Sequence, residues 1–337
     1  MRVLLTGANG FVGSRLLDRL LDAGHAPTLL LRPTADTALI EPLLSRCHVV
    51  PGALEDAASL DRACAGADAV LHVAGRTRAI HEQDFAAVNT EGTRRILDAA
   101  NRQATVRHFV FLSSLAAAGP GTPDRPAREE DTPHPVSAYG RSKRDAEARV
   151  RADARMPWTV VRPPVVYGPH DREFLPLFRM AQSRWLPLMH TGSQPLSIVY
   201  VDDLARAVAA CLDRPACHGK IVHAAHPDWT TPAALAEGIA HAVGRPRRAR
   251  TLPRGLLRAG CTAVHLAGRL TGRPGMLSLW KWPELTAAGW VCDSRHLHHD
   301  TGFLPETGLQ EGLRQTVAAY RAAGWLAPGR AAAGARP

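Results

Sequence analysis

The sequence predicts an α/β protein with a doubly wound parallel sheet. Short apolar runs alternate with stretches of helical spacing along the first half of the chain, as expected for strands covered on both faces. The expected strands lie at 3–5, 28–31, 49–50, 69–73, 109–112 and 159–161, and the expected helices at 11–23, 57–64, 82–101 and 138–155. A glycine-rich turn joins the first strand to the first helix, which adds to the evidence for this fold class.

That first turn, TGANGFVG at 6–13, carries three glycines at the spacing G-x-x-G-x-x-G. Gly7 suits a tight turn, Gly10 lets the backbone approach a pyrophosphate, and Gly13 lets the helix pack closely on the sheet. The helix N-terminus adds amide donors and a favourable dipole for phosphates. A plain strand-to-helix turn is the alternative, but the position of the loop at the start of the sheet favours a dinucleotide. The predicted contacts are Gly7, Asn9, Gly10, Phe11, Val12 and Gly13.

The residue after the second strand bears on which dinucleotide binds. A dinucleotide fold usually offers an acidic residue to the adenosine ribose at this point, whereas this chain has Arg32 followed by Pro33. A guanidinium suits a 2′-phosphate. NADP(H) is therefore the predicted cofactor, with Arg32 as a contact, and NAD(H) is the alternative.

Tyr139 and Lys143 are four residues apart in a stretch of helical spacing, so both project from one face. A tyrosine hydroxyl titrates near pH ~10, and a neighbouring ammonium stabilises its phenolate and brings proton transfer closer to neutral pH. Only three of the 41 basic residues are lysines, Lys143, Lys220 and Lys281, so this spacing rarely arises by chance. A surface pair is the alternative to a general acid/base pair.

After Arg162 the regular alternation gives way to a segment rich in proline and aromatic residues, and a strand-helix unit returns at 198–212. We therefore expect a dinucleotide-binding domain from residues 1–163 and 198–222. Residues 164–197 and 223–327 are expected to form a smaller, discontinuous substrate domain, and residues 328–337 a flexible tail.

Seven segments then follow one another in a specific order: TGANGFVG (6–13), HVAG (72–75), NTEGT (89–93), FLSS (111–114), YGRSK (139–143), RPPVVYGP (162–169) and YVDDLA (200–205). In this order they resemble the extended short-chain dehydrogenase/reductase family, also called the NAD-dependent epimerase/dehydratase family. The resemblance runs from residue 1 to about residue 326. It implies a Rossmann fold, a nicotinamide cofactor and enzymatic activity.

The resemblance also implies catalytic roles for particular residues. Tyr139 would be the general acid/base, and Lys143 would lower its pKa and hold the nicotinamide ribose. Ser114 would hydrogen-bond the reacting oxygen, with Ser113 as the alternative. Asn89 would help to organise the active site, with helix capping as its alternative role.

Further cofactor contacts are implied at Ala74, which would line the cleft, and at Pro163, near the nicotinamide. Many family members have an aspartate after the glycine of the third-strand loop, where it binds the adenine amine. Here Gly52 is followed by Ala53. Leu54 is the predicted contact in its place, Glu55 or Asp56 are the alternatives, and the contact is otherwise absent.

A second departure from the family pattern concerns the substrate. Sugar-nucleotide enzymes of the family tend to have an asparagine and an arginine facing the diphosphate where this chain has Val165 and Leu196. Burying a diphosphate against valine and leucine is costly. The resemblance is then to the branch of dihydroflavonol reductases and 3β-hydroxysteroid dehydrogenases. It predicts hydride transfer between NADP(H) and a carbonyl or hydroxyl of a hydrophobic small molecule. The alternatives are an epimerase or dehydratase of a sugar or lipid-linked sugar, and a non-catalytic NADP-sensing regulatory protein.

Composition bears on partners and location. No nucleic-acid recognition module is evident, so no nucleic-acid partner is predicted. Six scattered cysteines without a C-x-x-C pair and no secretory signal pattern predict a cytoplasmic protein. The cluster His296, His298 and His299 is interpreted as a solvated helix surface, and no metal is predicted. Family members often dimerise through the two long helices at 82–101 and 138–155, so the resemblance implies a homodimer.

The formal net charge of +10 is concentrated in one segment. Residues 238–283 contain no acidic residue and nine basic ones, which lie between Arg245 and Lys281. One side of its helical pattern carries Arg254, Arg258, Thr262, His265 and Arg269, and another carries Leu256, Ala259, Ala263, Leu266 and Leu270. The favoured interpretation is a helix of the substrate domain whose apolar face packs on the pocket. The alternative is peripheral contact of 245–281 with an anionic membrane.

Overall fold

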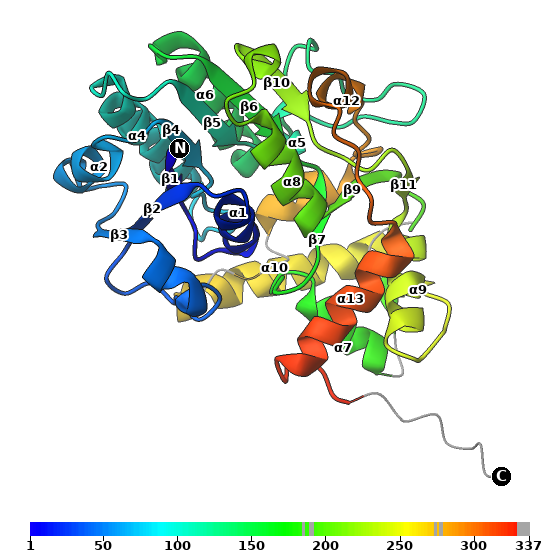
Figure 1. Ribbon diagram of the computed structural model, residues 1–337. Coiled ribbons are helices and arrows are strands. Elements are labelled where there is room, and N and C mark those ends of the chain that lie inside the picture. Colours follow the sequence, from blue (N-terminus) through cyan, green and yellow to red (C-terminus); the bar gives the residue numbers. More distant parts are fainter. Residues whose placement is uncertain (184–185, 189–191, 273–274, 276–278, 329–337) are drawn as a thin grey trace.

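The computed structural model describes residues 1–183, 186–188, 192–272, 275 and 279–328. Its centre is a seven-stranded parallel sheet, ordered β10-β6-β5-β4-β1-β2-β3 (Figure 1). The strands are β1 (Arg2–Thr6), β2 (Ala26–Leu31), β3 (His48–Pro51), β4 (Ala69–His72), β5 (His108–Leu112), β6 (Trp158–Arg162) and β10 (Lys220–His223). The order reverses its direction at β1 and β4, which confirms the predicted α/β fold class of Rossmann type.

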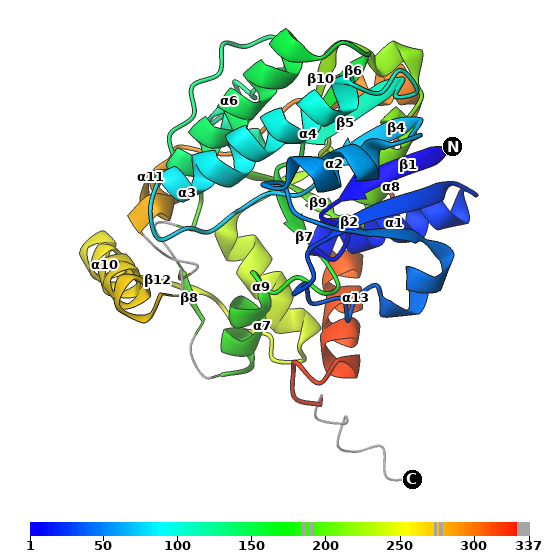
Figure 2. The same ribbon diagram turned by 90° about the vertical axis from the view of Figure 1, so that its left-hand side faces the viewer.

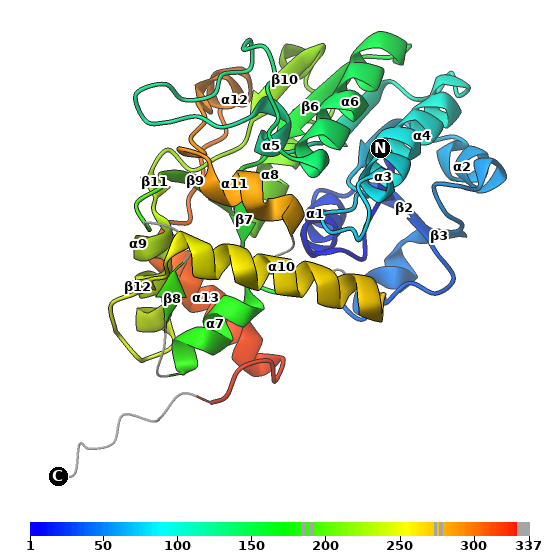
Figure 3. The ribbon, with the colours of Figure 1, turned by 180° about the vertical axis from the view of Figure 1, so that it is seen from behind.

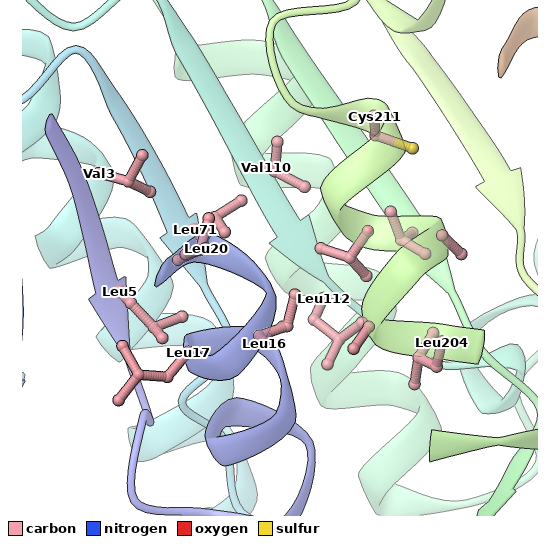
Figure 4. Packing of buried hydrophobic residues seen from close by; sticks show 14 of the residues in the cluster. Val3, Leu5, Leu16, Leu17, Leu20, Leu71, Val110, Leu112, Leu204 and Cys211 are labelled. Carbon is pink, nitrogen blue, oxygen red and sulfur yellow. The ribbon is translucent and has the colours of Figure 1, made fainter. Parts of the chain in front are cut away.

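Helices cover both faces of this sheet because its strands are apolar on both sides. On one face α1 (Phe11–Asp22) packs beside α8 (Val201–Cys211), and their leucines interlock with Val3, Leu5, Leu71 and Val110 of the sheet (Figure 4). On the other face lie α2 (Ala57–Cys64), α4 (Glu91–Asn101) and α6 (Ala138–Asp153), with their own buried apolar cluster. Two closed apolar layers thus hold the sheet rigid, and the strand ends that carry the site are fixed in position.

The parallel register aligns the carboxyl ends of the central strands. Thr6 of β1 pairs with Leu30 of β2 and with His72 of β4, and His72 pairs in turn with Phe111 of β5. The segments that follow these strands therefore meet at one edge, where open α/β sheets bind ligands.

The expected helix at 82–101 is divided into three parts. It comprises α3 (Gln83–Phe85), a π-helical turn (Ala86–Thr90) and α4. Asn89 lies in the π-helical turn. Such turns inside α-helices are frequent at functional sites, because they redirect side chains that a regular helix would place elsewhere.

A smaller layer lies below the carboxyl ends of the strands (Figure 2). Its three-stranded sheet is ordered β11-β9-β7 and is formed by β7 (Val165–Tyr167), β9 (Leu196–Tyr200) and β11 (Trp229–Thr230), while β8 (Pro187–Leu188) pairs with β12 (Arg250–Thr251). A shared apolar cluster joins α7 (Leu175–Gln182), α9 (Pro232–Ala242) and α13 (Leu309–Ala322). The strand-helix unit expected at 198–212 is shared between the layers, because β9 lies in this small sheet and α8 packs on α1.

The remaining elements are α5 (Leu115–Ala118), α10 (Arg254–Thr271), α11 (Trp282–Thr286), α12 (Arg295–Thr301) and 3-10 turns at Glu41–Arg46, Pro215–Cys217 and Leu279–Lys281. No helix of the described part of the chain is long and apolar enough to cross a bilayer. Apart from Pro328, the tail expected at 328–337 lies outside the described residues, as does the basic residue Arg273.

The favoured interpretation of the basic segment is wrong for α10. Leu257, Cys261 and Gly268 are its buried positions, whereas Leu256, Ala259, Ala263, Leu266 and Leu270 are all exposed. The two sets lie on different sides of the helix, so the apolar face identified from the sequence is not the face that packs on the protein.

Candidate active site

The glycine-rich loop closes at the carboxyl end of β1. Gly7 has a φ of +74°, and a Cβ there would lie 2.7 Å from the amide nitrogen of Ala74, so both backbone angle and space require glycine. A Cβ on Gly13 would lie 2.0 Å from the carbonyl oxygen of Gly7. Gly10 is the N-cap of α1 and donates to Gly7 O at 3.0 Å. The first amides of α1 therefore lie at a bare backbone turn that fits a pyrophosphate.

The adenosine end of this loop is bordered by the segment after β2. Asn9 Nδ2 donates to the carbonyl oxygen of Asp36 at 3.0 Å, and Arg32 is exposed directly after β2. The Asp36 carboxylate accepts from Ala38 N at 3.1 Å and pairs with Arg172 at 3.5 Å. Arg32 therefore occupies the position after the second strand that commonly faces the adenosine ribose in dinucleotide folds.

The loop after β3 contains the three residues considered for an adenine contact, and they differ in what their side chains do. Leu54 is half-buried and packs over α4, since a Cβ on Gly92 would lie 2.9 Å from its Cδ1. The carboxylate of Asp56 caps α2 by accepting from Ala58 N and Ser59 N, whereas Glu55 is exposed. Leu54 can therefore offer apolar packing to an adenine ring, and Asp56 is engaged in helix capping.

A buried polar bridge ties the loops after β1 and β4 together. Thr6 Oγ1 accepts from the amides of Val73 and Ala74, each at 3.2 Å, and lies 2.7 Å from His72 Nδ1. The other ring nitrogen of His72 lies 3.0 Å from Thr93 Oγ1. Burial lowers the pKa of His72 to about 3, helped by the nearby Lys143, so the ring is neutral and bonds at both nitrogens. Ala74 is thereby held against the glycine loop.

Tyr139 and Ser114 meet at the carboxyl end of β5. Ser137 caps α6 by accepting from Gly140 N at 3.0 Å, which sets the start of the helix that carries Tyr139. Ser114 precedes α5, and its hydroxyl lies near enough to the Tyr139 hydroxyl to lower the pKa of that phenol. Ser113 is buried and donates to Glu147 instead. The structure thus places Ser114, and not Ser113, at the tyrosine hydroxyl.

Lys143 lies one helical turn beyond Tyr139 and is buried. Its Nζ donates to the carbonyl oxygen of Leu112 at 2.8 Å and lies 4.6 Å from the centre of the Phe111 ring. Burial lowers the pKa of this amine to about 8. A Cβ on Gly75 would lie 3.3 Å from both Lys143 Nζ and Asn89 Oδ1, so the bare glycine leaves space beside the ammonium. These groups fit a ribose, whose hydroxyls need such donors.

Asn89 braces the same corner from the π-helical turn. Its Oδ1 accepts from Arg76 N at 2.7 Å, and its Nδ2 donates to Arg76 O at 3.0 Å and to Ser142 Oγ at 2.9 Å. The Ser142 hydroxyl donates to the carbonyl oxygen of Tyr139 at 2.7 Å. Asn89 therefore joins the loop after β4 to the helix of Tyr139, and its side chain makes no helix-capping bond in the described structure.

A second lysine, Lys281, lies directly at Tyr139. Its Nζ is 5.3 Å from the centre of the Tyr139 ring and 3.1 Å from Glu284 Oε2. Burial raises the pKa of Tyr139 to about 12, and Lys281 opposes that shift more than the nearby Ser114 hydroxyl does. Lys281 is therefore a second cation at this tyrosine, besides the predicted Lys143.

A pocket opens over Tyr139 between the two layers. It is lined by Thr77, Arg78, Phe85, Gly275, Trp280, Lys281 and Glu284. Thr77 Oγ1 and Arg78 Nε both donate to Glu173 Oε1, at 2.7 and 3.2 Å. None of these lining residues is among the site residues predicted from the sequence. Only Lys281 carried a signal, because it is one of three lysines in an arginine-rich chain.

Two predicted features lie at the margins of the site. Pro163 is buried beneath Ser114 and α5, and its carbonyl oxygen accepts from Leu115 N at 2.8 Å. His296 and His299 are exposed on α12, as expected for a solvated surface. The ligand atoms of His296, Glu129 and Glu130 lie within 4.8 Å of one another, away from the predicted cofactor residues in the sequence.

Comparisons with known proteins agree with this architecture. Residues 3–225 match the NAD dependent epimerase/dehydratase family. A ceramide reductase of Caulobacter vibrioides is 34% identical over 326 residues, covering 96% of each chain, and a UDP-glucose 4-epimerase of Vibrio cholerae is 26% identical, covering 94% of this chain and 95% of its own. The crystal structure of a UDP-glucuronic acid 4-epimerase from Bacillus cereus in complex with NAD superimposes with a TM-score of 0.76 at 20% identity, over 96% of this chain and 99% of the other. The chain therefore belongs to the NAD-dependent epimerase/dehydratase family of the extended short-chain dehydrogenases/reductases, whose members are enzymes.

Proposed function

We propose that this enzyme transfers hydride between NADP(H) and a carbonyl or hydroxyl carbon of a hydrophobic small molecule, with Tyr139 as the general acid/base. The observation that carries the proposal is the position of Tyr139, which has the Lys281 ammonium over its ring and the Ser114 hydroxyl nearby, at a pocket lined partly by Phe85 and Trp280. A hydroxyl pair next to a cation can polarise and protonate one carbonyl oxygen.

The residues fit a bound nicotinamide dinucleotide at both ends. The backbone turn at Gly7 and Gly13 would hold the pyrophosphate, and Lys143 with the space beside Gly75 would hold the nicotinamide ribose. When bound in its reduced form, the cofactor supplies the hydride that a carbonyl carbon takes up. We infer a preference for NADP(H) from the exposed Arg32 at the end of β2.

In the direction of reduction, Ser114 donates a hydrogen bond to the carbonyl oxygen and Tyr139 transfers its phenolic proton to that oxygen. The carbonyl becomes an alcohol, and Tyr139 is left as a phenolate next to the Lys281 ammonium. Solvent then returns the proton to Tyr139. In the opposite direction the phenolate removes the hydroxyl proton, so the same pair serves both directions.

The proposed substrate class rests on two positions outside this pocket and on one relative. Val165 and Leu196 are the first residues of β7 and β9, and neither offers a donor to a diphosphate. The 34% identical relative is named for its action on ceramide, an amide with long alkyl chains. We therefore propose a ketone or alcohol on an amphipathic, alkyl-chain-bearing molecule. Epimerisation of a sugar or lipid-linked sugar is the second candidate, and the relative named UDP-glucose 4-epimerase supports it.

Turnover of a substrate panel tests the proposal. NADPH consumption is followed with long-chain 3-oxo amides, alkyl 3-oxo esters and 3-oxo steroids, and separate assays look for epimerised UDP-glucose. We expect NADPH consumption with at least one apolar ketone, faster than with NADH, and a loss of about 100-fold or more in Tyr139→Phe. NADPH binding should be unchanged in that variant.

Three outcomes would contradict parts of this proposal. Normal turnover by Tyr139→Phe would remove the tyrosine mechanism, and equal or better use of NADH would remove the NADP preference. Cofactor binding without turnover of any carbonyl compound would instead favour a non-catalytic NADP-sensing protein.

A further inference from the structure

Helix α10 has three distinct sides. Leu257, Cys261 and Gly268 are buried against the protein, and His265 stacks edge-on against Trp280 at 5.8 Å between ring centres. Figure 3 shows the helix crossing the molecule between the two layers, and Figure 2 shows it nearly end-on at the edge. One narrow side is therefore enough to hold α10, and most of its circumference faces outward.

The second side is apolar and exposed. Leu256, Leu266 and Leu270 are 60%, 53% and 88% exposed, and Ala259 and Ala263 lie exposed between them. Only seven large apolar side chains are exposed in the described part of the chain, and three of them share this side. Such grouping on one helix face marks an interaction surface, because isolated exposed leucines would be scattered.

The third side is basic. Arg254 and Arg258 are exposed in the first turns of the helix and Arg269 in its last turn, between the buried side and the leucine face. Neither α10 nor any residue from 238 to 283 is acidic, and the exposed Arg245, Arg248 and Arg250 precede the helix. These charges favour an anionic partner.

We propose that α10 docks this enzyme on the surface of an anionic lipid bilayer, with the helix axis in the membrane plane. The leucine face would enter the boundary between headgroups and acyl chains, and the adjacent arginines would pair with lipid phosphates. The 18 residues of α10 span about 27 Å. A helix of this length that lies flat on a membrane brings its leucines and its arginines to the same membrane surface.

Pairing of α10 with a second copy of the chain fits the charges less well. Two apposed copies would bring Arg254, Arg258 and Arg269 close to the same arginines of the other helix. No acidic residue of α10 is available to offset that repulsion. A surface of anionic lipids supplies both the apolar medium and the negative charge.

The docking surface adjoins the pocket. Trp280, which stacks on His265 of α10, lines the pocket over Tyr139 and donates from Nε1 to Ile80 O at 3.2 Å. Docking would therefore bring the pocket region close to the membrane, where an alkyl-chain substrate is concentrated. The docking itself does not depend on the reaction, so it is tested without turnover.

Flotation of the purified full-length protein with lipid vesicles tests the proposal. We expect the protein to float with mixed phosphatidylglycerol and phosphatidylcholine vesicles at low salt, less so at high salt, and to stay unbound with phosphatidylcholine alone. A triple variant with Arg254, Arg258 and Arg269 changed to glutamine should partition on the order of 100-fold less, since each basic residue contributes roughly fivefold. The triple change of Leu256, Leu266 and Leu270 to glutamine should reduce partitioning by more than about tenfold.

Matched controls change exposed residues elsewhere. Leu304→Gln removes another half-exposed leucine, and glutamine at Arg62, Arg149 and Arg151 removes three exposed arginines from α2 and α6. Both controls should float like the wild type. Circular dichroism and NADPH binding should be unchanged in all variants, because none of these residues belongs to the site or the core.

The proposal fails if the wild type does not float at low salt, or if both α10 variants float as well as their controls. It also fails if the wild type does not bind vesicles but forms a dimer that the leucine changes dissociate. The leucine face of α10 would then be an interface between two copies of the chain. None of these outcomes bears on whether the enzyme reduces a carbonyl.

Discussion

Replacing Glu147 by glutamine should destabilise the protein far more than any surface change on the same helix. The Glu147 carboxylate lies on α6, 3% exposed, and receives Arg162 Nε at 2.9 Å and Nη2 at 2.5 Å. Ser113 also donates to it. Arg162 is 1% exposed, and its remaining Nη1 has no hydrogen-bond partner among the described residues. Glu147 therefore supplies the negative charge that compensates the buried guanidinium.

The size of the effect follows from what glutamine cannot do. It keeps one acceptor oxygen but turns an NH2 group toward the guanidinium, which costs one hydrogen bond to a charged group, about 1.5 to 3 kcal/mol. It also leaves the buried cation without a counter-charge. Breaking one side of a buried pair costs about 3 to 5 kcal/mol in total. We expect a loss in this range for Glu147→Gln.

Urea unfolding followed by circular dichroism measures this loss. The matched control is Asp153→Asn on the same helix, which removes an exposed pair with Arg149 at 3.8 Å and should cost less than about 1 kcal/mol. The double change Glu147→Met with Arg162→Met removes both charges and should recover most of the stability. A loss below about 1 kcal/mol in Glu147→Gln, or a double variant as unstable as the single one, would refute the reasoning.

Three further results are expected. Gly13→Ala should abolish NADPH binding, because the added methyl group would collide with Gly7 O. The control Gly255→Ala adds a methyl group in open space and should bind NADPH normally. Equal NADPH binding by both variants would contradict the role of the loop. Lys281→Met should raise the pH at which alcohol oxidation becomes efficient, because it removes the ammonium that favours the Tyr139 phenolate. Lys281→Arg keeps a positive charge and should shift the pH profile much less. Identical pH profiles of kcat/KM for the wild type and Lys281→Met would disprove the role of Lys281. The free energy of unfolding should fall as the pH drops from about 6.5 toward 3. Burial lowers the pKa values of His72 and His223 to about 3, so both rings stay neutral in the folded protein but take up protons in the unfolded chain. Each such histidine adds roughly 1.4 kcal/mol per pH unit to that slope, and a variant His72→Gln with an unchanged slope in urea unfolding would rule out its share.

The sheet and the glycine loop could be predicted because their signals are local. Apolar runs of strand length mark β1, β2, β4, β5 and β6, and a side chain at Gly7 or Gly13 is excluded by atoms within the loop or directly across from it. The four-residue spacing of Tyr139 and Lys143 is local in the same sense. Such features depend on a few neighbouring residues, so they appear in the sequence itself.

The tertiary contacts of the site could not be predicted in this way. Glu284 and Lys281 reach the start of α6 from a segment more than 130 residues away, where Glu284 accepts from Ser137. The role of Asn89 depends on a π-helical turn that no periodicity signals. Helical spacing also groups the residues of α10 into faces but does not decide which face meets the protein, since that depends on Trp280 and the surrounding loops.

The scarcity of lysine in this chain helps to identify two residues of the site. In a chain with 38 arginines and three lysines, 41 basic residues in all, a lysine stands where composition would favour arginine. Arginine stays charged at every physiological pH and needs a wide planar site, whereas lysine is a compact charge whose pKa responds to burial. Lys143 fits between Leu112 O and the Phe111 ring with its pKa lowered to about 8, and Lys281 lies over Tyr139 with its pKa raised by Glu284 and Glu173 against the effect of burial. Two of the three lysines thus accompany one tyrosine, one along its helix and one over its ring, which is why we propose that Lys281 takes part in the proton transfer proposed for Tyr139.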